Sequence, residues 1–191
     1  MAINSIWVFA QTAGGAPTTG TLELLTKARS LSSNVSAFIG GDASAVAGVL
    51  GEYGATKVYA TGDLAGKLPG PAVSAAMKAV IDGGDSPSVV MFPQNYEGRD
   101  VMARLSVKLN RTVITNNTDI ADSSDGVVAT TPIFGGNTLV NTAFTGEGHT
   151  WCHSVRRALL QSQQVEQQQA LLQHRCQTLA QLVQHALLQY T

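Results

Sequence analysis

Short apolar runs recur along the first two thirds of the chain, and polar or glycine-containing segments separate them. The runs are rich in β-branched and aromatic residues, as in INSIWVF and SVVMF. Continuous apolar runs of this length are typical of strands that are buried on both faces of a parallel sheet. The pattern therefore predicts strands at residues 3–9, 35–39, 57–60 and 88–92, and RTVIT adds a fifth at 111–115.

Helical periodicity fills the intervals between these runs. Leu24, Ala28 and Leu31 share one helical face, and Val101, Leu105 and Leu109 share another. Polar caps and the asymmetry of proline at helix starts and glycine at helix ends mark the boundaries. The predicted helices cover residues 21–31, 43–53 with Asp42 as N-cap, a third from about Pro71 to the residue before Gly83, and 98–109.

Strands that alternate with helices imply right-handed crossovers and an open sheet with helices on both faces. We therefore predict an α/β fold with a doubly wound, mostly parallel sheet. The rhythm changes after Asp119, where the β-rich segments GVVATTPIF and NTLVNTAFTG flank Gly135 and Gly136. Two such segments around Gly-Gly predict an antiparallel β-hairpin, which we expect to extend the edge of the sheet.

The residue composition changes abruptly near position 150. All 19 Gly and all 6 Pro precede it, whereas 11 Gln, both Cys and three of the four His follow it. The net charge is -3 for residues 1–150 and +2 for residues 151–191. We therefore divide the chain into a domain at 1–148 and an atypical Gln/Leu-rich tail at 149–191.

The overall charge excludes several classes of protein. A net charge of -1 without a Lys/Arg cluster argues against nucleic-acid binding, which depends on many phosphate contacts. No stretch approaches the roughly 18 to 20 apolar residues that a membrane span requires. The N-terminal sequence MAINSIWVFAQ lacks the basic region and the long apolar core of a signal peptide. We therefore expect a cytoplasmic protein.

The first 148 residues contain no His and no Cys, so they cannot form a Ser/His/Asp triad, a Cys/His dyad or a His-rich metal site. We therefore expect no catalytic and no metal-binding residues, and a protein that is not an enzyme. The candidates for binding lie in loops at the carboxyl ends of the predicted strands, because open α/β sheets bind ligands there. Glu97, Arg99 and Asp100 follow the fourth strand and could contact a ligand or form a capped helical turn.

Two glycine-containing segments superficially resemble phosphate-binding loops. The segment 62–68 (GDLAGKL) is one residue short of a P-loop and has Leu68 where Mg²⁺ binding needs Ser or Thr. Gly40 and Gly41 precede a predicted helix but lack the later glycines of a dinucleotide fingerprint. We therefore interpret 62–68 as an ordinary turn and Gly40-Gly41 as a helix-capping turn.

Three segments, in order, resemble one family. They are TLELLTKAR at 21–29, GRDVMARL at 98–105, and PIFGGNT at 132–138 with the strand that follows it. Residues 2–148 are similar in these motifs and their order to the N-terminal domain of the electron transfer flavoprotein α subunit. The resemblance implies a doubly wound domain akin to adenine-nucleotide α-hydrolases.

The resemblance also implies a function and its partners. The family forms a heterodimer with a β subunit and carries electrons from acyl-CoA and other dehydrogenases to a quinone-linked oxidoreductase of the respiratory chain, as in fatty acid β-oxidation. Its FAD is held chiefly by a second, C-terminal α-subunit domain, which we expect to be absent from this sequence. No cofactor-binding residue can therefore be assigned here, and we expect the chain alone not to hold flavin. Glu97, Arg99 and Asp100 become scaffold and interface candidates.

The tail allows three interpretations. Apolar residues at steps of three and four over 171–189 favour a helical docking or coiled-coil segment, whereas the Gln content favours a disordered extension. Our preferred hypothesis is an out-of-frame translation of the family's C-terminal part, because the break is sudden. Cys152, Cys176, His153 and His174 do not have the spacing of a known metal site. The alternative function for the whole chain is a nucleotide- or partner-binding module of the same fold with a helical interaction tail.

Overall fold

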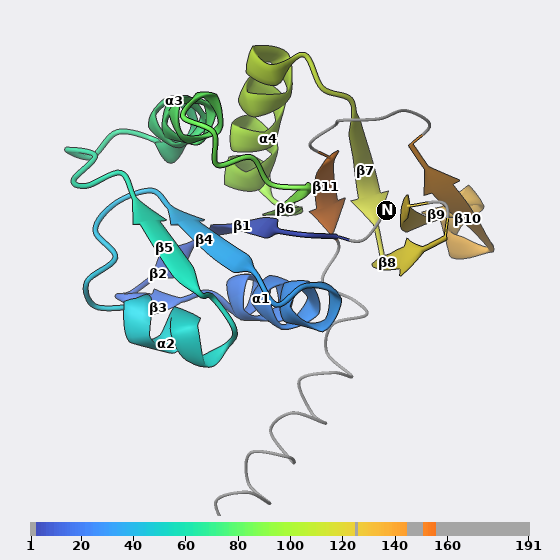
Figure 1. Cartoon of the computed structure of the whole chain (residues 1–191), viewed down its shortest axis with the longest axis horizontal. Helices are drawn as coiled ribbons and strands as arrows, with labels where there is room; N and C mark the ends of the chain where they lie inside the picture. The colour runs from blue at the N-terminus through green and yellow to red at the C-terminus, as the bar shows by residue number, and fades with distance from the viewer. Residues whose placement is uncertain (1–2, 125, 145–150, 156–191) are drawn as a thin grey trace, which may run out of the picture.

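The computed structural model describes residues 3–124, 126–144 and 151–155. It contains a central sheet, four α-helices and a smaller antiparallel sheet (Figure 1). The strands are β1 (Ile6–Ala10), β2 (Thr12–Ala13), β3 (Ala16–Pro17), β4 (Val35–Ile39), β5 (Lys57–Ala60), β6 (Val89–Pro93), β7 (Val113–Asn117), β8 (Asp119–Ser123), β9 (Gly126–Ile133), β10 (Thr138–Ala143) and β11 (Trp151–Val155). The helices are α1 (Thr19–Leu31), α2 (Ala47–Glu52), α3 (Pro69–Asp82) and α4 (Tyr96–Leu109), with a 3₁₀ turn η1 (Phe134–Gly136).

The central sheet has the strand order β5-β4-β1-β6-β11-β7, and all of its neighbouring strands are parallel. Every residue of β1, β4 and β6 is buried, as the uninterrupted apolar runs predicted. The prediction of a doubly wound, mostly parallel α/β fold is confirmed.

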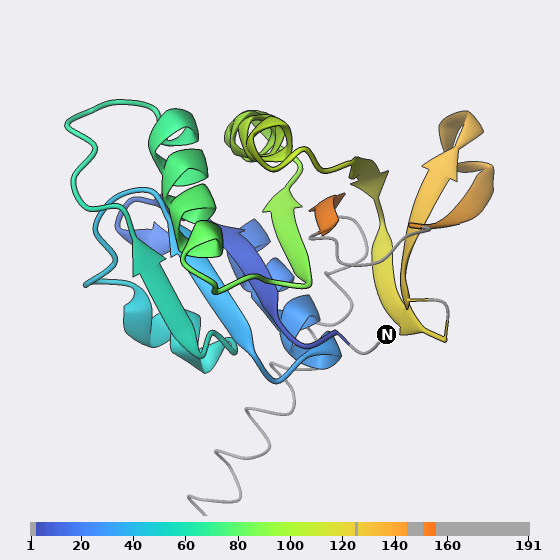
Figure 2. The same ribbon diagram turned by 45° about the horizontal axis from the view of Figure 1, so that its top comes forward.

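Helices cover both faces of this sheet. Helices α1 and α2 lie on one face, and α3 and α4 lie on the other (Figures 1 and 2). Because successive side chains of a strand point to opposite faces, β1 contributes to both cores. Ile6 and Val8 pack with residues of α1 and α2, while Trp7 and Phe9 pack with residues of α3 and α4.

The second helix differs from its prediction. The sequence predicted residues 43–53 with Asp42 as N-cap, but α2 covers only Ala47–Glu52. The Asp42 carboxylate instead accepts hydrogen bonds from the backbone N–H of Ser44 at 3.0 Å and from the Ser44 hydroxyl at 2.6 Å. This local Asx turn, which competes with helix formation, delays the start of the helix.

The predicted hairpin exists as β9 and β10, but it does not extend the central sheet. It forms a separate three-stranded antiparallel sheet in the order β10-β9-β8. β9 pairs on both of its edges, with β8 and β10, so neither of its edges is left for β7. All six residues of β10 are exposed.

The central sheet also includes a strand from the Gln-rich segment. β11 lies between β6 and β7, with Trp151 opposite Val89 and Cys152 opposite Val113. It lies beyond the boundary that we predicted at residue 148. Residues 156–191, which hold most of the predicted tail, lie outside the described residues. In the described part of the chain, no helix is long and apolar enough to cross a membrane.

Candidate functional site

The topological switch point of the central sheet lies between β1 and β6. The chain moves from β1 outward to β4 and β5, then returns past β1 to β6. Open α/β sheets bind ligands at the carboxyl ends of the strands that flank such a point. Gln11 directly follows β1, and Gln94 and Asn95 directly follow β6. These loops therefore form the candidate site.

Gln11 joins the two loops. Its Nε2 donates a hydrogen bond to Glu97 Oε2 at 2.5 Å, and its Oε1 accepts one from Asn95 Nδ2 at 2.6 Å. Its backbone N–H donates to Thr21 Oγ1 at 2.8 Å, and the Thr21 hydroxyl donates back to the Gln11 carbonyl at 3.1 Å. We call Gln11, Asn95 and Glu97 the switch-point cluster. The cluster holds the first turns of α1 and α4 against the end of β1.

The start of α4 is fixed by close packing. Asn95 caps the helix, since its Oδ1 accepts from the backbone N–H of Gly98 at 2.9 Å. A Cβ at Gly98 would overlap the carbonyl oxygen of Pro93, so only glycine fits there. The Glu97 carboxylate in the first turn also interacts favourably with the positive end of the helix dipole. The carboxyl end of β6 and the start of α4 therefore have little freedom to move apart.

The structure separates the three residues that the sequence nominated together. Glu97 faces the switch point through Gln11. Asp100 instead accepts from Arg104 Nε at 2.7 Å and lies against Gly70 at the start of α3, where a Cβ would meet its carboxylate. Arg99 is exposed on the first turn of α4. Only Glu97 therefore belongs to the switch-point cluster, and Asp100 serves the contact between α3 and α4.

The two phosphate-loop look-alikes have local structural roles. Within 62–68, Asp63 Oδ1 accepts from the backbone N–H of Ala65 at 2.8 Å, which closes a turn. At the end of β4, a Cβ on Gly40 would overlap the Pro69 side chain at 2.7 Å and crowd Val73 at 3.0 Å. Gly40 therefore lets α3 pack closely on the sheet, a reason that the sequence alone did not show.

The metal hypothesis that the sequence disfavoured is not tested by the described residues. Cys152 and His153 lie in β11, where only their strand pairing is described, and Cys176 and His174 lie outside the described ranges. Within the residues described with their side chains, no group of three or more His, Cys, Asp or Glu could hold a metal ion. No metal chemistry is therefore assigned.

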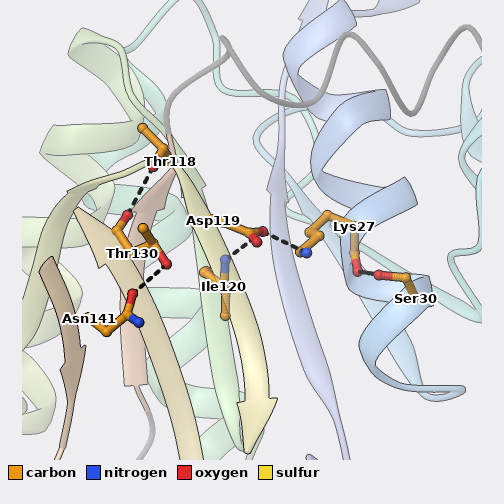
Figure 3. Close-up of polar contacts among 7 residues, drawn as sticks. All are labelled: Lys27, Ser30, Thr118, Asp119, Ile120, Thr130 and Asn141. Carbon is orange, nitrogen blue, oxygen red and sulfur yellow. Dashed lines mark hydrogen bonds and ion pairs between the residues drawn. The ribbon is translucent and has the colours of Figure 1, made fainter. Parts of the chain in front are cut away.

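A second set of polar contacts joins α1 to the antiparallel sheet. Lys27 on α1 lies 2.6 Å from Asp119 Oδ1 at the start of β8, and its side chain is only 12% exposed (Figure 3). The same Asp119 oxygen accepts from the backbone N–H of Ile120 at 2.9 Å. Ile120 is buried in the core with residues of α1. These contacts fix the antiparallel sheet against α1, and no sequence pattern predicts them because they join residues far apart along the chain.

The outer strand of the antiparallel sheet carries an exposed apolar surface. Phe134 is 78% exposed, Leu139 64% and Val140 38%. We call Phe134 and Leu139 the hairpin surface, because Val140 directly follows Leu139 in the strand and so points to the opposite face of the sheet. Single exposed apolar residues are common, but two large ones on a turn and the adjoining edge strand favour a surface that contacts another protein. The hairpin surface and the switch-point cluster are thus the two candidate functional regions.

The fold and these two regions define a doubly wound α/β domain with a small polar cluster at its switch point and an apolar hairpin at one side. The chain belongs to the electron transfer flavoprotein family, because the family model described as "Electron transfer flavoprotein domain" matches residues 6–170. The resemblance predicted from the three sequence motifs is thereby confirmed. The matched range also extends beyond the predicted boundary at residue 148.

One relative is the "Electron transfer flavoprotein subunit alpha" of Syntrophomonas wolfei subsp. wolfei (strain DSM 2245B / Goettingen). It is 30% identical over 143 residues, which cover 74% of this chain and 45% of the relative. The chain therefore spans less than half the length of this relative.

Proposed function

We propose that the chain acts as the N-terminal part of an electron transfer flavoprotein α subunit. In a heterodimer with a β subunit in the cytoplasm, it would carry electrons from acyl-CoA and other dehydrogenases to a quinone-linked oxidoreductase of the respiratory chain. The observation that supports this most is the family match over 6–170, on a fold whose described elements contain the predicted motifs. Electron carriage needs a bound redox group rather than a catalytic side chain, which agrees with the absence of His and Cys before His149.

The switch-point cluster does not suit FAD, the cofactor of the family. Both polar atoms of the Gln11 amide are used within the cluster, and Asn95 Oδ1 caps the backbone N–H of Gly98. The cluster contributes two amides and one carboxylate, and Glu97 would repel a pyrophosphate. This supports the proposal that FAD is held by a further domain and not by this chain alone. We derive no step through FAD from the described residues.

The hairpin surface is the proposed contact region for the β subunit. Phe134 and Leu139 are large apolar residues that a soluble partner could cover. The Lys27–Asp119 ion pair and buried Ile120 hold the antiparallel sheet against α1, so it would present this surface in a fixed orientation. Preorganised surfaces lose less conformational entropy on association.

The division at residue 148 and the origin of the 149–191 segment remain part of this proposal. β11 and the matched range to residue 170 favour continuity of the domain for some distance past 148. The change in Gln, Gly and Pro content favours an out-of-frame origin for at least part of the segment. Reading the encoding DNA in its other frames distinguishes these views. If no alternative frame restores a flavin-domain sequence, the out-of-frame hypothesis is wrong.

A second candidate function is a nucleotide-binding module of the same fold. One observation favours it: the buried Oε1 of Gln94, beside the switch point, accepts no hydrogen bond from the described residues. An amide oxygen in that position could accept from an adenine amino group. The site would need the Gln11–Glu97 contact to open, because that contact spans the switch point.

The test is to purify the chain alone and together with a β subunit, and to record visible absorbance and binding. We expect the chain to bind the β subunit and to show no flavin absorbance when purified alone. Flavin absorbance with the chain alone would contradict the assignment of FAD to a further domain. Failure to bind the β subunit, together with tight AMP or ATP binding in a titration, would favour the nucleotide-binding module instead.

A further inference from the structure

Three aromatic side chains on adjacent strands are in mutual contact between the centre of the sheet and its edge; we call them the aromatic stack, although only the two outer rings are stacked and the inner ring is tilted against both. Trp7 lies on β1, Phe38 on β4 and Tyr59 on β5. The ring centroids of Trp7 and Phe38 are 5.1 Å apart, those of Phe38 and Tyr59 are 4.7 Å apart, and those of Trp7 and Tyr59 are 5.7 Å apart. The Phe38 and Tyr59 rings are within 17° of parallel. At these separations the π systems are in contact.

The outer end of this stack carries charged groups, and its inner end carries none. The Tyr59 hydroxyl donates a hydrogen bond to Asp85 Oδ2, and Lys57 Nζ lies 3.1 Å from the same oxygen. Trp7 and Phe38 are each 1% exposed, whereas the Asp85 side chain is 48% exposed. Asp85 can therefore accept a proton from Tyr59 and is itself exposed to solvent. These contacts provide no proton acceptor for the buried Trp7 and Phe38.

We infer that Tyr59 is a redox-active tyrosine. When one electron is removed from the aromatic stack, the radical localises on Tyr59, and Asp85 accepts the proton of its hydroxyl. This inference concerns the chemistry of the chain itself and goes beyond the proposed electron-carrier function. It does not depend on a bound FAD or on a β subunit.

The step uses a one-electron oxidant, for which a photoexcited flavin in solution serves. The flavin takes one electron from Trp7 and becomes a flavin radical anion. The Trp7 radical cation then takes one electron from Tyr59, whose O–H bond breaks as its proton forms an O–H bond with Asp85. The products are intact Trp7, a neutral Tyr59 phenoxyl radical, protonated Asp85 and the one-electron-reduced flavin, so electrons and protons balance.

Among the tyrosines that the structure describes, Tyr59 is distinguished by its hydrogen bond to Asp85. A phenol is oxidised readily only when its proton leaves in the same step, because the phenol radical cation is a very strong acid. Tyrosine hydroxyls are protonated at neutral pH, and burial raises the pKa of Tyr59 further above its ordinary value, so its oxidation needs an acceptor for the proton. If solvent exposure alone decided which tyrosine is oxidised, Tyr96, which is 91% exposed, would be oxidised first.

Lys57 disfavours the oxidation of Tyr59, so its removal should change the yield of oxidised Tyr59 in the opposite direction to removal of Asp85. Its ammonium lies 4.4 Å from the centroid of the Tyr59 ring, where a positive charge disfavours loss of an electron. It also pairs with Asp85; the Tyr59 hydrogen bond first and the Lys57 contact second lower the pKa of that carboxyl. Lys57→Met should therefore increase oxidation at Tyr59, whereas Asp85→Asn should decrease it.

The test uses the full chain with Trp151→Phe, which leaves Trp7 as its single tryptophan. Flash excitation of flavin mononucleotide generates the oxidant. Transient absorbance follows the indole and phenoxyl radicals, and mass spectrometry maps the oxidised residues. We expect indole radical absorbance to decay as phenoxyl absorbance grows, with more product at Tyr59 than at Tyr96. Adding Tyr59→Phe should leave the indole radical long-lived.

Matched carboxylate variants separate proton acceptance from general charge effects. Asp85→Asn should lower the yield at Tyr59 severalfold, while Asp82→Asn, at the end of α3 and paired with Lys78, should leave it unchanged. Circular dichroism confirms that each variant is folded. Equal yields in the two asparagine variants, or oxidation that follows exposure with Tyr96 ahead of Tyr59, would overturn the inference.

Discussion

The hairpin surface offers the sharpest test of how this chain contacts a partner. Leu139 on β10 is 64% exposed in the isolated chain. Burial of a whole leucine side chain is worth about 1.5–3 kcal/mol, so covering the exposed part contributes about 1–2 kcal/mol. Leu139→Ser should therefore weaken binding of the β subunit by roughly 5- to 30-fold, because about 1.4 kcal/mol corresponds to tenfold in Kd.

Isothermal titration of the chain with a purified β subunit measures this loss. The free energy of unfolding should change by less than about 0.5 kcal/mol, since the residue is exposed and outside the core. Leu68→Ser is the matched control, because Leu68 is 72% exposed in the loop between β5 and α3, near the other edge of the central sheet. Equal effects of the two substitutions on Kd, or none at Leu139, would refute the assignment of the contact region.

Three further predictions concern the scaffold. Gly98→Ala should lower the free energy of unfolding by about 1–3 kcal/mol, because its Cβ would overlap a backbone carbonyl that cannot move aside, whereas Gly48→Ala, with open space around it, should not. Lys27→Met should lower the free energy of unfolding in urea by about 1 kcal/mol, and the same substitution should lower it no further when Asp119→Asn is already present. If the losses from the two substitutions add, the two side chains are not coupled as an ion pair. The Tyr59 hydrogen bond and then Lys57 lower the pKa of Asp85 from 3.8, so its contribution to stability is present above that pH and is lost as the pH falls through the lower folded-state pKa. Asp85→Asn should remove the contribution of Asp85 to the loss of stability at low pH. If the unfolding midpoint of this variant depends on pH as in the wild type, the prediction is wrong.

The sequence predicted the central sheet well because its strands are buried on both faces. Residues 35–39 are apolar except Ser36, and the strand there has the predicted bounds. Strand partners were harder to predict, because a pattern of side chains does not specify which edge a hairpin joins. The β9–β10 hairpin was therefore placed correctly along the chain and wrongly in space.

The candidate site shows the same limit more strongly. Glu97 was nominated from its place after a predicted strand, but its partner Gln11 is 86 residues away along the chain. Gln11 itself gave no signal, since a single amide in a loop is unremarkable. The change in composition near residue 150 does not predict β11, because strand pairing depends on backbone groups that any non-proline residue supplies.

The position of β11 has a consequence for the order in which the chain folds during synthesis. Strands β6 and β7 have no hydrogen-bonded pairing with each other in the described sheet, since β11 lies between them. Trp151 pairs with Val89, so the edge of β6 that faces β11 stays unpaired while about 60 further residues are synthesised, which takes roughly 3–12 s at typical translation rates. During that interval the edge of a strand rich in valine is open to pairing with other nascent chains. We expect chaperones to protect the ribosome-bound chain from such pairing until β11 has left the exit tunnel.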